Sequence, residues 1–413
     1  MRIVAFTLAV LLSCFAASAQ TKVYLITIGP GAESYEKFGH NMLWVHDPAH
    51  HYDPAYNWGI FSFDEGFVGR FIQGRLEYWM DAWDATKVLD EYKRADRSIW
   101  IQELNLSEAQ AQLLLTRCEL NRQPQYSHYK YDYYRDNCST RVRDMLDSVI
   151  GGQIKAQLQN VPTDTTYRWH TRRLTQDDWW LYVGLDYIMG HPIDHPISAW
   201  EECFLPVRMM ERLKSMKIKD ESGREVPLVL SNEKVYQSKT EIDRERPPRY
   251  AIWIFAGVGI VLGGIMAALA LGKRRWTRIA FAVVVVAWAL LSGLAGSFCT
   301  YAWFFTDHVV ARYNENWLQL NPVAIVLVVL VPAMLLGKQW GARHFALAAA
   351  VLSAVGLIAK ILPSMYQVNG EIIALALPAN IGMALAVRMV WRGGNEMMVI
   401  RRGAGRSAGN MPR

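Results

Sequence analysis

Five apolar runs in the C-terminal part of the chain constrain its fold more than any other feature of the sequence. Most of them reach the ~20 residues that an α-helix needs to cross a bilayer. The third run is shorter and contains Pro332. The runs cover roughly residues 251–271, 279–304, 323–336, 345–363 and 372–390. They predict an all-α membrane domain of about five transmembrane helices within residues 249–392.

The composition agrees with a protein that lies partly in a membrane. Of the 413 residues, 52% are hydrophobic and 20% are charged, whereas soluble domains are usually about 45–50% apolar and about 25% charged. This balance argues against a wholly soluble or disordered chain. Residues 251–413 carry a net charge of +10 and residues 1–250 a net charge of −4. Because the basic excess lies among the apolar runs, it indicates membrane orientation and no nucleic-acid partner.

The loops between the runs predict which side of the membrane each one faces. Twelve basic residues lie on one side, in the segments 272–278, 337–344 and the tail from Arg388. The two loops on the other side, 305–322 and 364–371, contain Arg312 as their only basic residue. Basic loops stay in the cytoplasm. We therefore expect five spans, an exported N-terminal half, and a cytoplasmic basic tail at residues 393–413.

The N-terminus has the pattern of a secretory signal peptide. Met1-Arg2 is followed by an apolar run from Ile3 to Leu12 and then by Ala17-Ser18-Ala19. A basic start, a short apolar core and an A-x-A site are typical of a cleaved signal. We assign residues 1–19 to it; a lipidation signal ending at Cys14 is a weaker alternative. Either interpretation places the following residues in the bacterial periplasm.

The cysteines are scattered and do not form a metal-binding or disulfide pattern. There are five of them, and no two are spaced as CxxC: Cys14, Cys118, Cys138, Cys203 and Cys299. An odd number at such spacings predicts neither a disulfide framework nor a zinc site. We expect no metal.

The exported half shows both strand and helix patterns, which predicts an α+β domain. Strand-like segments are expected at 22–28, 41–45 and 56–63, and amphipathic helices are expected after Ser107 and over 141–150. Ser107 and Gln110 have the spacing of a helix capping box. We divide this half into a catalytic domain at 20–165 and an elaboration and linker at 166–248.

Cys138 is the candidate nucleophile. It lies where an aromatic-polar loop meets an amphipathic helix. Backbone N–H groups at a helix N-terminus favour a thiolate and can stabilise an oxyanion. We assign this oxyanion or support role to Asn137 and Ser139. The alternative, a buried inert thiol, suits Cys118, Cys203 and Cys299 better.

His40 is the candidate base. It precedes the strand expected at 41–45, which could aim its ring at the thiol. A catalytic imidazole also needs a partner that fixes its tautomer. If the strands 41–45 and 56–63 pair, Asn57 could reach the ring, with Asp53 as the second choice.

Three motifs together resemble a known family. They are Phe38-Gly39-His40, Tyr56-Asn57-Trp58-Gly59 and Asn137-Cys138-Ser139-Thr140. With the histidine before the cysteine, they resemble a circularly permuted papain-like (NlpC/P60-like) fold. With the signal peptide and the spans, the chain is similar to the Lnb family of bacterial lipoprotein N-acyltransferases. The outward segments Phe305-Thr306-Asp307-His308 and Asn314-Glu315-Asn316-Trp317-Leu318 also resemble that family's membrane half.

The resemblance implies an activity in the bacterial inner membrane. Cys138 would take an acyl chain from a phospholipid as a thioester, with His40 as base. The chain would pass to the N-terminal cysteine amine of a diacylated lipoprotein, and no cofactor would be needed. Asp307 and His308 would contact the lipid or its head group.

Three other functions fit the same residues. A cell-wall peptidase or amidase could use the same Cys–His pair, although one membrane anchor would be enough for it. An intramolecular lipoprotein transacylase would move an acyl chain within a single lipoprotein. A non-catalytic membrane-anchored scaffold would bind lipoproteins or wall peptides without using Cys138.

Overall fold

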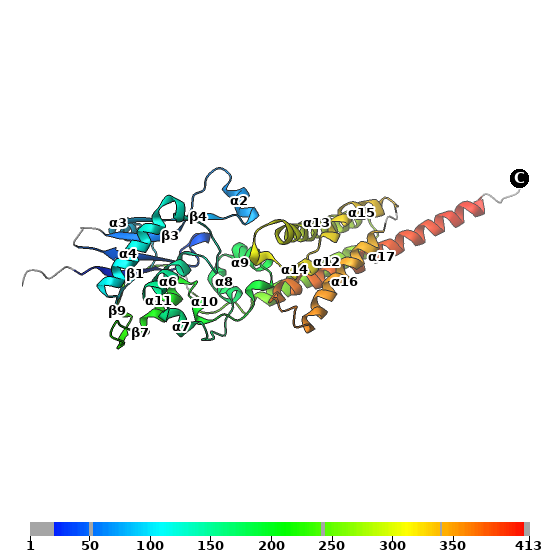
Figure 1. Cartoon of the computed structure of the whole chain (residues 1–413). Helices are drawn as coiled ribbons and strands as arrows, with labels where there is room; N and C mark the ends of the chain where they lie inside the picture. The colour runs from blue at the N-terminus through cyan, green and yellow to red at the C-terminus, as the bar shows by residue number, and fades with distance from the viewer. Residues whose placement is uncertain (1–19, 49–52, 241–243, 339–340, 409–413) are drawn as a thin grey trace, which may run out of the picture.

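The computed structural model describes residues 20–48, 53–240, 244–338 and 341–408. The predicted signal peptide at 1–19 lies outside the described residues. A sheet-rich body is followed along the chain by a bundle of long helices (Figure 1). This arrangement confirms the α+β domain followed by an all-α membrane domain.

An antiparallel sheet of seven strands forms the centre of the N-terminal body, in the order β6-β4-β3-β2-β1-β5-β9. The strand expected at 22–28 is β1, and the next strand begins at His40 itself. The third strand ends at Ile60, three residues earlier than expected, with a register shift after Trp58. The strands are β1 (Lys22–Ile28), β2 (His40–His46), β3 (Pro54–Ile60), β4 (Glu77–Asp84), β5 (Ile99–Leu104), β6 (His128–Lys130) and β9 (Val229–Tyr236).

Alternating side chains of the strands pack on the two faces of the sheet, as the two-residue period of a strand requires. Leu25 and Leu43 belong to a core with side chains of α4 (Glu108–Arg122), α6 (Cys138–Val149) and α11 (Pro206–Lys214). Ile26 and Met42 belong to a second core with Val88 of α3 (Ala85–Arg94). The capping box predicted at Ser107 is present at the start of α4.

The segment after residue 165 completes the sheet and also leads to the membrane. Strand β9 pairs with β5, so part of the expected elaboration belongs to the central sheet. Helices α8 (Tyr167–Thr175) and α9 (Trp179–Ile188) lie between the sheet and the membrane helices (Figure 1). The remaining short elements are α2 (Phe67–Gln73), α5 (Pro124–Ser127), α7 (Gln153–Leu158), α10 (Ala199–Glu202), β7 (Lys217–Lys219) and β8 (Glu225–Pro227).

Among the described residues, five helical segments are long and apolar enough to cross a membrane, as predicted. The third is interrupted and starts at Asn316, so the outer loop expected at 305–322 is shorter than its sequence suggested. The spans are α12 (Ala251–Leu271), α13 (Arg275–Phe305), α14 to α15 (Asn316–Leu335), α16 with η5 (Ala342–Ile361) and the first part of α17 (Gly370–Ala408).

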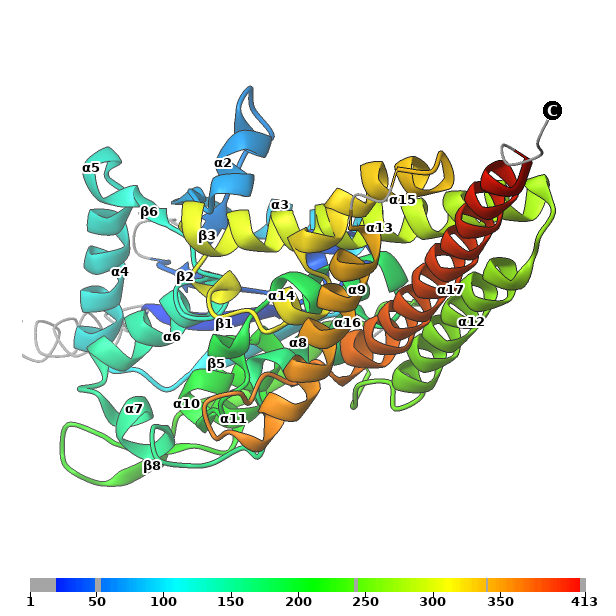
Figure 2. The ribbon, with the colours of Figure 1, turned by 90° about the vertical axis from the view of Figure 1, so that its right-hand side faces the viewer.

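The first and last spans pack against each other along their length (Figure 2). A Cβ added to Gly382 of α17 would lie 2.3 Å from the Cα of Gly263 in α12. A Cβ added to Gly259 would lie 2.3 Å from the carbonyl oxygen of Leu375. Small residues allow helix backbones in a membrane to approach this closely.

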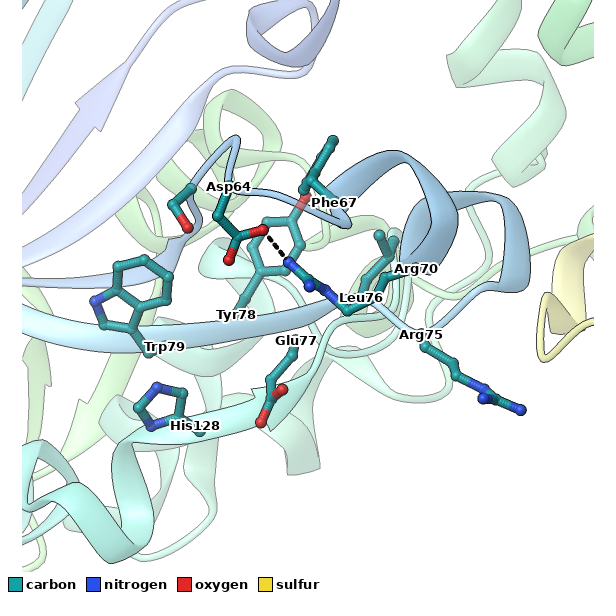
Figure 3. Close-up of a pocket in the computed structure, with 10 residues that line it drawn as sticks. Asp64, Phe67, Arg70, Arg75, Leu76, Glu77, Tyr78, Trp79 and His128 are labelled. Atoms are coloured by element: carbon teal, nitrogen blue, oxygen red, sulfur yellow. Dashed lines mark hydrogen bonds and ion pairs between the residues drawn. The ribbon is translucent and has the colours of Figure 1, made fainter.

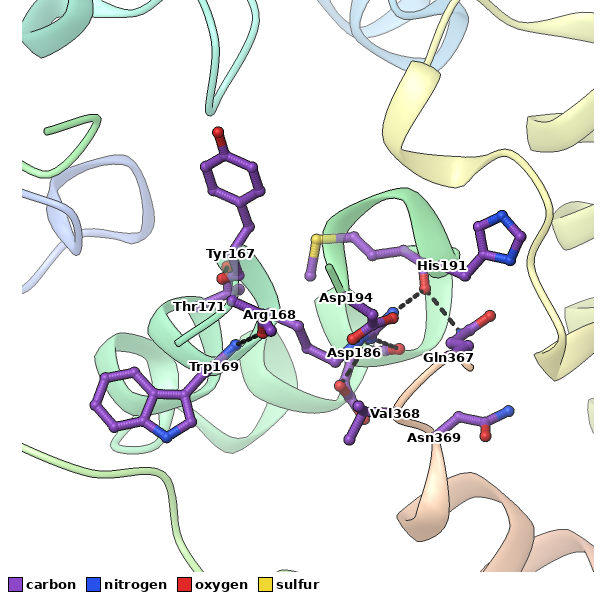
Figure 4. Close-up of polar contacts among 12 residues, drawn as sticks. Tyr167, Arg168, Trp169, Thr171, Asp186, His191, Asp194, Gln367, Val368 and Asn369 are labelled. Carbon is purple, nitrogen blue, oxygen red and sulfur yellow. Dashed lines mark hydrogen bonds and ion pairs between the residues drawn. The ribbon is translucent and has the colours of Figure 1, made fainter. Parts of the chain in front are cut away.

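Buried ion pairs fix the N-terminal body to the outer ends of the spans. Arg172 of α8 donates to Asp186 at 2.7 Å and to Glu371 of α17 at 2.7 Å. Arg168 donates to Asp186 at 3.0 Å and to Asp194 at 2.7 Å, and Figure 4 shows these side chains meeting beside Gln367. Because each charge has a partner at hydrogen-bond distance, the cost of burying it is offset.

Removing one partner of this network should destabilise the whole chain. We expect Arg172→Ala to lower the free energy of unfolding by about 3–5 kcal/mol, because two buried carboxylates lose a partner. The control is Arg244→Ala, since Arg244 pairs with Asp177 at the surface, where solvent screens the pair and its loss should change the stability little. Denaturant titration of the full chain in detergent, followed by tryptophan fluorescence, measures both values. Equal losses in the two variants would contradict the prediction.

Candidate active site

Cys138 is the first residue of α6, where the helix leaves its N–H groups without helical partners. The side chain of Asn137 accepts hydrogen bonds from the N–H groups of Ser139 and Thr140, both at 2.9 Å. Its amide nitrogen donates to the carbonyl oxygens of Tyr133 and Phe204. Asn137 therefore caps the helix and holds the turn that carries Cys138.

A chain of hydrogen bonds joins this helix start to strand β2. Asn41 donates to the hydroxyl of Ser139 at 3.0 Å, and Ser139 donates to the carbonyl oxygen of Cys203 at 2.7 Å. Thr27 of β1 donates to the side-chain oxygen of Asn41 at 2.9 Å. All of these side chains are buried. The sequence analysis predicted Ser139 as a site residue. It did not predict Asn41, although Asn41 directly follows His40.

His40 begins β2 and is oriented by the neighbouring strand. Its Nε2 donates to the Oδ1 of Asn57 at 2.6 Å. Because that nitrogen carries the proton in this hydrogen bond, Nδ1 is left as the basic atom of the neutral ring. The structure thus brings His40 and Asn57 together. The second choice, Asp53, instead contacts His46 at 2.6 Å and accepts from Trp44 at 3.0 Å.

Cys138 and His40 lie on adjacent parts of the structure. The backbone N–H of Asn41, the residue after His40, hydrogen-bonds to the Cys138 sulfur and lowers its pKa. No direct hydrogen bond between the thiol and the imidazole occurs within the described residues. Catalytic hydrogen bonds are often long without substrate and shorten when it binds.

The protonation states differ from the sequence expectation. Burial raises the pKa of Cys138 to about 11, although the N–H groups of Asn41 and Ser139 and the charge of Arg97 lower it in part. The lowered pKa expected at a helix N-terminus is therefore not found, because desolvation outweighs the helix effect. Burial and Arg97 lower the pKa of His40 to about 4, against the hydrogen bond to Asn57. At neutral pH both groups are uncharged, and His40 can accept a proton.

Arg97 is a charged neighbour of the site that the sequence did not reveal. Its side chain is buried and donates to the carbonyl oxygen of Gly29 and to Glu36. Its positive charge acts on both Cys138 and His40. Arg97 is 41 residues from the cysteine in the sequence, and no motif marks it.

Gly59 leaves space beside Cys138. Its φ of +86° lies in the region that glycine adopts without strain. A Cβ at this position would lie 3.5 Å from the Cβ of Cys138 and 3.5 Å from the ring of Tyr131. Tyr131 in turn stacks on Tyr78 of β4, with ring centroids 4.3 Å apart. Two stacked aromatic rings, those of Tyr131 and Tyr78, therefore lie next to Cys138.

A cavity of about 190 Å³ lies beside Tyr78, which forms part of its lining. Figure 3 shows its charged residues, including the ion pair between Asp64 and Arg70. Cys138 and His40 do not line this cavity.

Asp307 and His308 contact helix α2. The N–H of Asp307 donates to the carbonyl oxygen of Gln73 at 2.8 Å, and the His308 Nε2 is 2.7 Å from the carbonyl oxygen of Phe71. Arg75 and Lys130 lie 3.4 and 3.6 Å from the Asp307 carboxylate. Among the described residues, no group of three or more His, Cys, Asp and Glu side chains could hold a metal ion.

The fold defines a class of protein: an α+β domain fixed to five helices of membrane-spanning length. Residues 15–173 match the model of the Lnb N-terminal periplasmic domain, and residues 247–389 match that of the Lnb transmembrane domain. The chain belongs to the Lnb family, a lipoprotein N-acyltransferase-like family of the inner membrane. Comparison with curated proteins finds no match, and comparison with solved structures finds none either.

The pKa values predict how Cys138 reacts with iodoacetamide. Because the thiol has a pKa of about 11, its thiolate fraction should rise about tenfold per pH unit below that value. We expect the alkylation rate to rise continuously between pH 6 and pH 9, as measured by mass spectrometry of the Cys138 peptide. A rate that does not change over this range would instead indicate a thiolate–imidazolium pair.

The hydrogen bond from His40 predicts the effect of changing Asn57. We expect Asn57→Ala to slow the reaction of Cys138 with an ester substrate about 10- to 100-fold, because the base loses the group that fixes its tautomer. Asp53→Ala is the control, since Asp53 contacts His46. Equal effects of the two substitutions would contradict the orienting role of Asn57.

Proposed function

We propose that this protein moves an acyl chain from a phospholipid to the N-terminal cysteine amine of diacylated lipoproteins. The observation that carries the proposal is the position of His40. Its ring is hydrogen-bonded to Asn57 at 2.6 Å, and the next residue in the chain, Asn41, contacts the start of α6. The Lnb domains support lipoprotein acylation as the process. In this proposal the catalytic side chains lie within residues 20–165, while residues 166–248 complete the central sheet through β9 and link the domain to the membrane.

The first half-reaction forms a thioester. The Nδ1 of His40 takes the thiol proton as the Cys138 sulfur attacks the ester carbonyl carbon of the phospholipid. Backbone N–H groups at the start of α6 stabilise the oxyanion, and Asn137 and Ser139 hold that turn in place. The carbon–oxygen bond then breaks, and His40 protonates the oxygen of the departing lysophospholipid.

The second half-reaction releases the acyl chain. The α-amine of the diacylated lipoprotein attacks the thioester carbonyl, and His40 accepts a proton from the attacking nitrogen. The carbon–sulfur bond breaks, the thiolate takes the proton back, and the product is an amide with three acyl chains. The residues named supply every proton transfer, so the route uses no metal or cofactor.

The membrane arrangement supports this substrate choice. With a periplasmic domain before five spans, we propose that the C-terminal tail lies in the cytoplasm, and its arginines support this. The domain then faces the outer leaflet, where phospholipids and lipoprotein anchors are both present. In this arrangement Asp307 and His308 contact head groups, with Arg75 and Lys130 supplying positive charge beside them.

Mass spectrometry of a reporter lipoprotein tests the proposal. The protein is supplied to cells depleted of their own N-acyltransferase, as wild type, Cys138→Ser, His40→Ala or Cys203→Ser. We expect a third acyl chain on the α-amine with wild type, and loss of at least 100-fold with the first two variants. Cys203→Ser should retain activity, since a hydroxyl can replace the thiol that donates to the carbonyl oxygen of Ala199.

Other outcomes contradict the proposal in different ways. An acyl chain that moves within the lipoprotein, with no gain in total acyl chains, would indicate an intramolecular transacylase. Full activity of Cys138→Ser would remove the thioester step. An unchanged diacyl peptide in every sample would reject this acceptor, and digestion of wall peptides would then test the peptidase alternative.

A further inference from the structure

A row of five aromatic rings connects helix α2 with the nucleophile. We name it the aromatic row; its members are Phe71, Phe67, Phe61, Tyr78 and Tyr131. Successive ring centroids lie 6.1, 5.9, 5.1 and 4.3 Å apart. At its inner end Tyr131 faces Cys138 across Gly59, which has no side chain to separate them. The row of rings therefore runs from α2 to the neighbourhood of Cys138.

The outer end of the row lies at the membrane. Phe71 belongs to α2, whose backbone is hydrogen-bonded to Asp307 and His308 directly after the end of span α13. Figure 2 shows α2 beside this end of α13. Phe304 and Phe305, the last residues of that span, are 64% and 72% exposed. The apolar surface of the span therefore continues onto α2.

The hairpin at residues 61–76, which connects β3 to β4 and carries three of the five rings, also exposes apolar side chains next to the membrane. Phe63 is 71% exposed, Val68 is 68% exposed and Ile72 is 41% exposed. A cluster of large apolar side chains on one short hairpin usually marks an interaction surface. Because the hairpin is joined to the outer end of a membrane helix, the partner that it meets is the bilayer.

Charged groups border the row, as a phospholipid requires. Phe67 and Tyr78 also line the cavity of Figure 3. Its charged walls are two basic and two acidic side chains: Arg70, Arg75, Asp64 and Glu77. The Arg75 side chain is 66% exposed, so it can meet a phosphate group at the surface. Apolar rings beside basic side chains match the acyl chain and head group of one lipid.

We propose that the hairpin at residues 61–76 inserts into the outer leaflet and that the aromatic row binds one acyl chain of a phospholipid. This binding positions the ester of that chain at Cys138. This inference rests on the proposed function, since it assigns the donor's binding site. It goes further in naming the residues that select a membrane lipid over a soluble ester.

Photocrosslinking tests the membrane contact without requiring catalysis. Benzoylphenylalanine replaces Val68 or, as the matched control, Val235 of the edge strand β9, which is 41% exposed at the opposite edge of the sheet from β4. The full chain is placed in phosphatidylethanolamine nanodiscs and irradiated. We expect lipid adducts at position 68 to exceed those at position 235 at least tenfold. Equal amounts would overturn the membrane contact.

Kinetics test the role of the row itself. In the same nanodiscs we expect Val68→Asp and Phe67→Ser to slow formation of the Cys138 thioester at least tenfold, while Val235→Asp changes it less than twofold. Alkylation of Cys138 by iodoacetamide should stay within twofold in all three variants, which shows that the site is folded. Unchanged thioester formation in Phe67→Ser would overturn the role of the row, and unchanged formation in Val68→Asp would overturn the insertion of the hairpin.

The two proposals can fail separately. If the wild type forms no thioester, the proposed function is wrong, and the crosslinking result alone decides whether the hairpin meets lipid. If the wild type forms the thioester and Phe67→Ser forms it equally fast, the proposed function stands and the aromatic row is not the donor site.

Discussion

The buried contact between Arg172 and Glu371 fixes the position of the periplasmic domain relative to the membrane helices. It joins α8 of the periplasmic domain to the outer end of the last span. A nucleophile that acts on a membrane lipid must be held at a fixed height and angle above the bilayer. A flexible linker would not provide this, because effective concentration falls when the linked parts sample many arrangements. Charged pairs that are buried between the two parts limit those arrangements.

Burial also sets the chemistry of the site. It raises the pKa of the Cys138 thiol and lowers that of the His40 imidazole, so the resting pair is neutral. A neutral thiol is less prone to oxidation in the periplasm than an exposed thiolate. In the proposed reaction, the thiolate forms only when a substrate is present and His40 takes the proton. The buried Arg97 charge favours that anion when it forms.

Much of the architecture could be predicted from the sequence, because long apolar runs and basic loops have direct physical meaning in a membrane. The spans, the first strands and the capping box at Ser107 follow from local patterns. Asn57 could be placed beside His40 because paired strands bring such residues together. Arg97, the Asn41–Ser139 contact and strand β9 could not be predicted, since each depends on chain segments that meet only after folding. The pKa of Cys138 was misjudged because burial cannot be read from a helix start.

The close approach of Gly263 and Gly382 has a consequence for how the membrane domain is made. These glycines belong to the first and the last span, which lie more than a hundred residues apart in the chain. The first span reaches the membrane early in synthesis but finds its main packing partner only when the last span has emerged. Until then its glycine face must meet lipid or the translocation machinery. The membrane domain therefore completes its assembly late, and a chain cut before α17 would leave its first helix without the partner that it fits.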